Sequence, residues 1–120
     1  MLIQDLDVYK KAHQITLSVY AVTEKFPKSE IFGLVSQMRR AAVSIASNLA
    51  EGAARKTSGE TIHFIGISRG SAAELRYQIT LARDLKFIAQ NTAEELLKQM
   101  DSILQMLSGL MRNTRATYIE

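Results

Sequence analysis

The chain has 120 residues, 47% of them hydrophobic and 22% charged, which is typical of a globular protein, and we expect a single domain over residues 1–120. The absence of cysteine excludes a disulfide framework and a thiolate metal site. No apolar run reaches the roughly 18 residues that a membrane span needs, so we expect no membrane association. The net charge of +3 permits contact with nucleic acid without indicating it. No signal peptide is recognisable, and we expect a cytoplasmic protein.

The hydrophobic periodicity predicts four helices, of which the first begins near Asp5 or Asp7. These carboxylates suit the positive end of a helix. Pro27 disfavours helical geometry at Phe26, so this helix is expected to end near Lys25. Its expected buried stripe is Val8, Ala12, Ile15, Val19 and Val22.

The second helix is expected over residues 31–55, and the rest of the chain is organised around it. Ser29 is its expected N-cap, and the helix is expected to fray around residues 52–56. Its apolar residues at helical spacing are Ile31, Leu34, Met38, Ala42, Ile45 and Leu49. Most of its other side chains are small, which predicts crowding on more than one side, including contact with a neighbouring subunit.

The third helix is expected from a cap at residues 57–58 to about Phe87, with Glu60 in its first turn. Its expected apolar face is Phe64, Ile67, Leu75, Ile79, Ala82 and Leu85. Gly66, Gly70 and Ala73 make a small-residue track on another side. Because a glycine costs a helix about 1 kcal/mol relative to alanine, this track predicts close approach by another helix.

The fourth helix is expected to begin at a capping box, Thr92-x-x-Glu95, and to fray over residues 113–120. Its apolar positions are Leu96, Leu97, Met100, Ile103, Leu104, Leu107, Leu110 and Met111. Four helices joined by short links predict an all-α fold, an antiparallel up-down-up-down four-helix bundle.

Arg69, Arg76 and Arg83 recur every seven residues on the predicted third helix. They therefore share one face and span about 20 Å. We call them the arginine ladder. Repeated on every subunit of an oligomer, the ladder suits the phosphates of RNA or DNA, with backbone contact and little sequence reading. The alternative is a solvated face whose arginines pair with Asp84, Glu74 or a neighbouring helix.

Arg39 and Arg40 face away from the apolar stripe of the second helix. They either contact phosphate or pair with Glu51 or Glu74 across a subunit seam. We also expect a hydrogen-bonded network between the second and third helices that crosses between subunits. Its expected members are Asn48, Glu51, Arg55, Ser71, Glu74 and Gln78. The expected interface residues are Glu51, Arg55, Gly70, Ser71 and Glu74.

No combination of residues indicates an enzyme, a metal site or a cofactor site. Glu51 and Glu74 could form an acid–base pair. However, no nucleophile, metal triad or phosphate-binding loop accompanies them. His13 and His63 lie on different predicted helices, and neither has a second ligand at metal spacing. We therefore expect no catalytic residues, no metal and no cofactor.

Several motifs follow one another along most of the chain. They are Asp5-Leu6-x-Val8-Tyr9-x-Lys11-Ala12, Phe26-Pro27-x-x-Glu30-x-x-Gly33-Leu34, Gln37-x-Arg39-Arg40-Ala41-Ala42-Val43-Ser44-Ile45, Asn48-x-Ala50-Glu51-Gly52 and Gly70-Ser71-x-x-Glu74-Leu75. In these motifs the chain resembles the four-helix-bundle proteins encoded in intervening sequences of bacterial 23S ribosomal RNA genes.

The resemblance implies a bundle that assembles as a ring, a homopentamer. It also implies kinship with the accessory proteins of diversity-generating retroelements, which resemble nucleic-acid-binding partners of a reverse transcriptase. We therefore expect a non-enzymatic homo-oligomer whose basic surface binds RNA or DNA weakly and without sequence specificity. The alternative is a scaffold that docks a protein partner and has no nucleic-acid function. Charge-driven nucleic-acid binding weakens steeply with salt, which separates the two.

Overall fold

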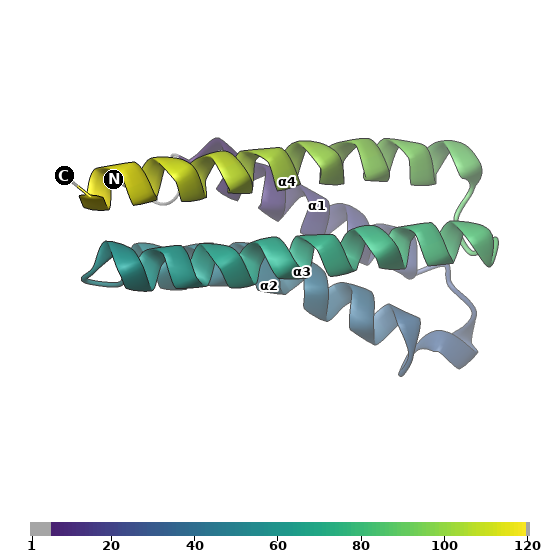
Figure 1. Ribbon diagram of the computed structural model, residues 1–120. Helices are drawn as coiled ribbons and strands as arrows, with labels where there is room; N and C mark the ends of the chain where they lie inside the picture. The colour runs from purple at the N-terminus through teal and green to yellow at the C-terminus, as the bar shows by residue number, and fades with distance from the viewer. Residues whose placement is uncertain (1–5, 120) are drawn as a thin grey trace.

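The computed structural model describes residues 6–119, with side chains described as far as Thr114. In this part of the chain the helices are α1 (Asp7–Thr23), the short 3-10 helix η2 (Lys28–Glu30), α2 (Leu34–Ala53), α3 (Ser58–Asp84) and α4 (Gln90–Ile119). The four α-helices run in alternating directions, so the start of α1 and the end of α4 lie at the same end of the bundle (Figure 1). α1 and α3 each contact α2 and α4, and the pairs α1/α3 and α2/α4 lie on the diagonals. The predicted up-down-up-down bundle is confirmed.

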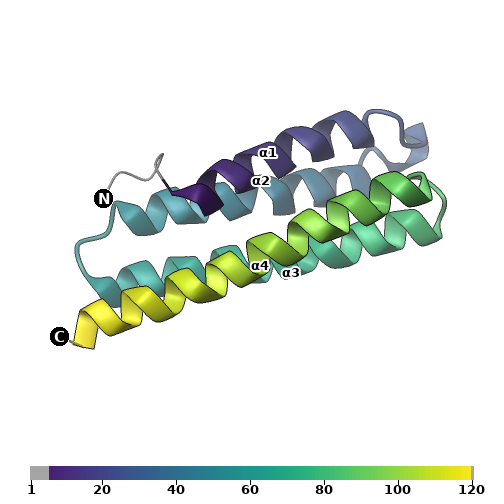
Figure 2. The ribbon, with the colours of Figure 1, turned by 90° about the horizontal axis from the view of Figure 1, so that it is seen from above.

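The core consists largely of the apolar stripes that the periodicity predicts. Its largest fully buried apolar side chains are Ile15, Val19, Met38, Ile45, Leu75, Ile79, Met100, Ile103 and Leu107. Burying each of these contributes about 1.5–3 kcal/mol relative to exposure. The stripes predicted for α1 and α2 are mostly correct, although Val22 is only partly buried and Ile31 is exposed. Figure 2 shows the arrangement of the four helices from above.

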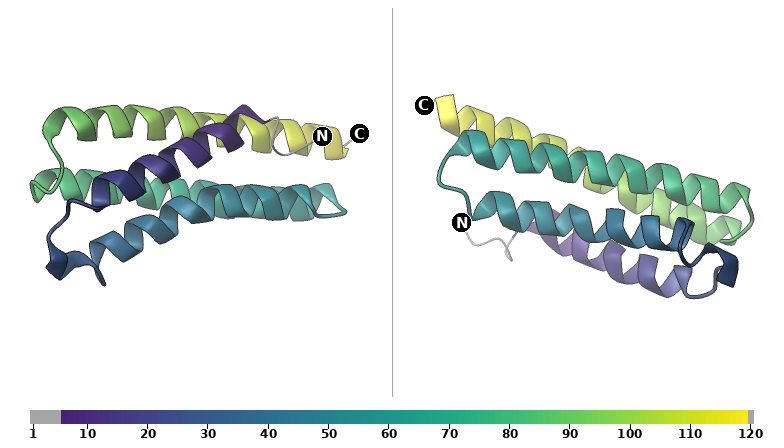
Figure 3. Two further views of the ribbon diagram at one scale, coloured as in Figure 1. Left: turned by 180° about the vertical axis from the view of Figure 1, so that it is seen from behind. Right: turned by 90° about the horizontal axis from the view of Figure 1, so that it is seen from below.

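The start of α2 differs from the prediction. Ser29 is not its N-cap, because Ser29 lies within η2 and α2 begins at Leu34. The side chain of Glu30 takes over the capping role, since its Oε1 accepts a hydrogen bond from the Leu34 N–H at 3.3 Å. Ile31 and Phe32 therefore lie on the turn between η2 and α2 and not on the core face of a helix. This turn lies at the end of the bundle away from the termini (Figure 3).

The predicted cap at the start of α3 is confirmed, because the Thr57 side chain accepts a hydrogen bond from the Glu60 N–H. Its end was predicted too late: α3 stops at Asp84, and Lys86 has a left-handed backbone with φ of 65°. The Phe87 N–H then donates to the Ala82 carbonyl at 2.9 Å, which closes the helix in a Schellman motif.

The predicted apolar face of α3 was partly wrong. Leu75, Ile79 and Ala82 are buried, but Ile67 and Leu85 are exposed. Ile65 and Ala72 occupy the core instead. The helix carries apolar side chains on two faces, and only one of these faces packs inside the bundle.

α4 begins at Gln90, so the capping box predicted at Thr92 is wrong and Thr92 lies in the first turn. α4 continues to Ile119, so the tail over which fraying is expected has helical backbone; Glu120 lies outside the described residues, as does Asp5 at the other end. Over the described residues, none of the helices combines the length and the apolar character that crossing a membrane requires.

Candidate nucleic-acid and assembly surfaces

The arginine ladder lies along the contact between α3 and α4, and two of its three members are paired with carboxylates. Arg76 binds Asp101 of α4 through two hydrogen bonds, Nε to Oδ1 at 2.6 Å and Nη2 to Oδ2 at 3.3 Å. Arg83 donates from Nε to Oδ1 of Asp84 at 3.1 Å. Pairing with Asp84 and with a neighbouring helix, the alternative to phosphate contact, is therefore present within one chain.

The pair formed by Arg76 and Asp101 affects the titration of both groups. The hydrogen bond from Arg76 lowers the pKa of Asp101, and the same bond raises the pKa of Arg76. Both groups therefore stay charged at neutral pH. Both side chains are exposed to solvent, and such pairs contribute little to stability. A phosphate approaching Arg76 has to compete with Asp101 for the same N–H groups.

Arg69 is the ladder member without a carboxylate partner in the described part of the chain. Its Nε donates to the Ser108 hydroxyl at 2.8 Å. Arg69, Ser108 and Arg112 line a surface hollow of about 360 Å³ together with Leu104 and Gln105. The hollow presents two cations and no acid, which suits an anion.

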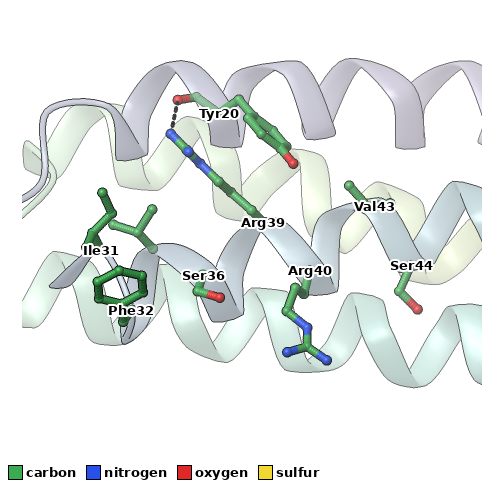
Figure 4. Close-up of a pocket in the computed structure, with 9 residues that line it drawn as sticks. Tyr20, Ile31, Phe32, Ser36, Arg39, Arg40, Val43 and Ser44 are labelled. Atoms are coloured by element: carbon green, nitrogen blue, oxygen red, sulfur yellow. Dashed lines mark hydrogen bonds between the residues drawn. The ribbon is translucent and has the colours of Figure 1, made fainter.

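Arg39 and Arg40 have different environments. Arg39 is held by α1: its Nε donates to Thr23 Oγ1 at 2.9 Å, and its guanidinium lies 4.6 Å from the ring centre of Tyr20. Its acidic neighbour within the chain is Glu24 at 3.5 Å. The Arg40 side chain points away from Arg39 and from α1, and it borders the same surface hollow from the other edge of α2 (Figure 4). Over the described residues Arg40 forms no ion pair or hydrogen bond.

The polar network expected between α2 and α3 is present only in fragments. One fragment joins the helices: the hydroxyls of Ser44 and Ser71 share a hydrogen bond of 2.8 Å, and Asn48 Nδ2 donates to Ser44 Oγ at 2.9 Å. The other two fragments form no hydrogen bond between the helices. Arg55, just beyond the end of α2, donates to Glu51 of α2, and Gln78 Nε2 donates to Glu74 Oε1 at 3.2 Å in α3.

Gly70 does not pack against another part of its own chain. A Cβ atom added there meets nothing within 4 Å, whereas one added at Gly66 lies 3.6 Å from Met111 Cε. The close approach of helices within the bundle occurs at Gly52 instead. An added Cβ there would lie 3.0 Å from Phe64 Cβ. Any packing role of Gly70 therefore requires a second molecule.

A groove between α1 and α2, not predicted from the sequence, carries the most exposed large apolar side chain of the described residues. Its volume is about 650 Å³. We call it the α1/α2 groove; its lining is Tyr20, Ile31, Phe32, Val35, Ser36, Arg39, Arg40, Val43 and Ser44. Phe32 is 95% exposed at one end of it (Figure 4). One signal for this exposed turn was present in the sequence: Ile31 and Phe32 are adjacent apolar residues shortly after Pro27. The helical spacing assigned both residues to the second helix instead.

The exposed large apolar side chains are unevenly distributed over the bundle. They are Leu17, Tyr20, Ile31, Phe32, Val43, Ile67, Tyr77 and Leu85. All of them belong to α1, α2, α3 or the turn before α2, and none lies among the described side chains of α4. No group of three or more metal-ligating side chains occurs in residues 6–114.

These features define an all-helical bundle with one apolar side and a mostly neutralised row of arginines on another. The chain matches the 23S rRNA-intervening sequence proteins over residues 4–109, and it belongs to this family.

A crystal structure of a protein of unknown function from the S23 ribosomal protein family of Bacteroides thetaiotaomicron VPI-5482 is similar to this chain, with a TM-score of 0.81. The two chains are 18% identical, and the similarity covers 88% of this chain and 95% of the other. At this identity the similarity supports the fold alone. No curated protein matches the chain.

Proposed function

We propose that this protein is a non-enzymatic, self-assembling helical bundle, a homo-oligomer whose subunits meet through the apolar side formed by α1, α2 and α3. The family resemblance makes a ring of five subunits the expected form. The single observation that carries the proposal is the exposure of Phe32, 95%, at the end of an apolar groove. Monomeric proteins rarely expose contiguous apolar surface of this kind.

The turn that carries Phe32 is well suited to an interface because it is already ordered. The Gly33 N–H donates to the Glu30 carbonyl at 3.0 Å, and the Ile31 N–H donates to the Lys28 carbonyl at 3.2 Å. Burying a phenylalanine side chain gains about 1.5–3 kcal/mol. Because the turn is fixed before association, little of this gain is lost to ordering it.

Gel filtration coupled to light scattering tests the proposal. The wild-type protein at micromolar concentration should have a mass that is a multiple of the single chain, with five as the expected number. Phe32→Ser should shift the mass towards the monomer, whereas Gln105→Ser, on the exposed face of α4, should leave it unchanged. A monomeric wild-type protein would contradict the proposal.

A second candidate function is weak, sequence-independent binding of RNA or DNA on the α3/α4 side. The hollow of Arg69 and Arg112 supports it, because two cations converge there without an acid. The pairing of Arg76 and Arg83 with aspartates limits it.

This candidate predicts that Asp101→Asn, which frees Arg76, strengthens binding. The slope of log affinity against log salt should steepen by about one unit for each subunit in contact. Glu94→Gln makes the same change in net charge elsewhere on α4 and serves as the control. Equal effects of the two substitutions would show a response to net charge alone and would exclude the ladder as the site.

A further inference from the structure

The composition of the α1/α2 groove indicates a protein as its occupant. Its nine lining residues include two aromatic residues, two arginines and three aliphatic residues, but no lysine, aspartate or glutamate. Protein–protein interfaces are enriched in aromatic residues and arginine, and depleted in lysine and in acids. Buried Val35 forms part of the lining, whereas Val43 and Tyr20 are exposed.

A second apolar surface lies on the outer face of α3. We define the α3 ridge as Ile67, Gly70, Glu74 and Tyr77, whose spacing of three, four and three residues places them on one face of the helix. Tyr77 is 63% exposed, and the space beside Gly70 is open to 4 Å. The ridge extends about 15 Å along the helix. An exposed apolar face with a glycine at its centre permits close approach by another molecule.

The groove and the ridge carry opposite charges. Arg40 lines the groove and forms no ion pair or hydrogen bond over the described residues. Glu74 lies in the middle of the ridge, and its carboxylate accepts a hydrogen bond only from the neutral amide of Gln78 there. An interface that brings Arg40 and Glu74 together would pair both charges.

We propose that the α1/α2 groove of one copy of this chain receives the α3 ridge of a second copy, with Arg40 of one copy facing Glu74 of the next. This inference rests on the proposed self-assembly and specifies its surfaces. The groove and the ridge are different surfaces, so the contact is heterologous. Each added copy leaves one groove and one ridge available, and the repeated contact closes a ring when the rotation between successive copies divides a full turn, as the proposed ring of five requires.

Exchanging the two charges between chains tests this contact. Arg40→Glu alone and Glu74→Arg alone each place like charges at every interface and should weaken self-association roughly tenfold or more. When the two variant chains are mixed, each interface between unlike chains regains an opposite pair, so the chains should associate again. A ring of five cannot alternate two kinds of chain throughout, so recovery is measured as complexes that contain both variants and not as the wild-type mass. Within each variant chain residues 40 and 74 still carry like charges, so recovery reports pairing between chains.

Circular dichroism first establishes that both variants fold, as expected for substitutions at exposed positions. Val43→Ser and Tyr77→Ser form a second, uncharged pair of variants. Each alone should lose assembly, and their mixture should give a dimer held by the one intact interface. This pair decides the question if a charge variant fails to fold.

The outcomes separate this inference from the proposed function. If the wild-type protein is an oligomer and neither Glu74→Arg nor Tyr77→Ser changes its mass, the α3 ridge does not occupy the groove. The proposal of self-assembly would remain. Loss of assembly in both single charge variants without recovery on mixing would also overturn the contact. A monomeric wild-type protein would overturn both proposals.

Discussion

Gly52→Ala tests the closest approach of two helices in the bundle. Gly52 is buried near the end of α2, and its carbonyl accepts a hydrogen bond from the Thr61 hydroxyl of α3 at 2.8 Å. An alanine Cβ there would lie 3.0 Å from Phe64 Cβ and 3.3 Å from the Thr61 carbonyl oxygen. Neither of these atoms is the flexible end of a side chain. Relief therefore requires α3 to shift, and overpacking of this kind costs roughly 1–3 kcal/mol.

The gain in helix propensity opposes this cost. Replacing glycine by alanine stabilises a helix interior by about 1 kcal/mol, and by less at Gly52, which lies in the last turn. We expect a net destabilisation of about 1–2 kcal/mol, which corresponds to a fall in Tm of roughly 3–10 °C.

Thermal unfolding monitored by circular dichroism, at one fixed protein concentration, measures this change. Gly66→Ala is the matched control. Its added Cβ would lie 3.6 Å from the mobile end of Met111, an ordinary contact, so its Tm should stay the same or rise. A Gly52→Ala protein as stable as the Gly66→Ala protein would refute the reasoning about close approach.

Two further predictions concern stability. Lys86→Gly should stabilise the protein by about 0.5–1 kcal/mol, because Lys86 has a left-handed backbone that glycine adopts without steric cost. Urea unfolding measures this change, and an unchanged or lower midpoint would contradict the prediction. The folded-state pKa of Asp101 is lowered by Arg76, so its stabilising effect is present above the pKa of the unfolded chain and is lost as the pH falls through the folded-state pKa. The wild-type protein should accordingly have a higher Tm than the Asp101→Asn protein at pH 7, and the two Tm values should become equal in strong acid. A difference in Tm that persists in strong acid would exclude the ion pair as its cause.

The fold was predictable because its apolar stripes have a clear helical period. The error in α3 has a physical cause. Ile67 and Leu85 are apolar and helically spaced, but they lie on an outer face, and periodicity alone cannot tell an apolar core face from an apolar surface. The helix starts were mislocated for another reason. Ser29 and Thr92 are good capping residues, but the hydrogen bonds of the actual turns start α2 and α4 elsewhere.

The candidate site was predictable only in part. The seven-residue spacing placed the ladder on one face, and this geometry holds. The partner of Arg76 was not predictable, because Asp101 is 25 residues away and meets it only when α3 and α4 pack together. The exposure of Phe32 likewise depends on the turn that ends η2; Pro27 shortly before it was a signal, but the helical spacing from Ile31 onward assigned Phe32 to the second helix.

The most direct test of the account is cross-linking between the groove and the ridge in the assembled protein. The chain contains no cysteine, so single introduced thiols react without interference. Chains carrying Ser36→Cys, in the groove lining, and chains carrying Ala73→Cys, exposed beside the α3 ridge, are given different tags, co-expressed and treated with a short bis-maleimide. Lys98→Cys on α4 replaces Ala73→Cys in the control. The account predicts a cross-linked product with both tags from Ser36→Cys and Ala73→Cys, and none from the control pair. Cross-linking of Ser36→Cys chains only to one another, or of no chains at all, would contradict it.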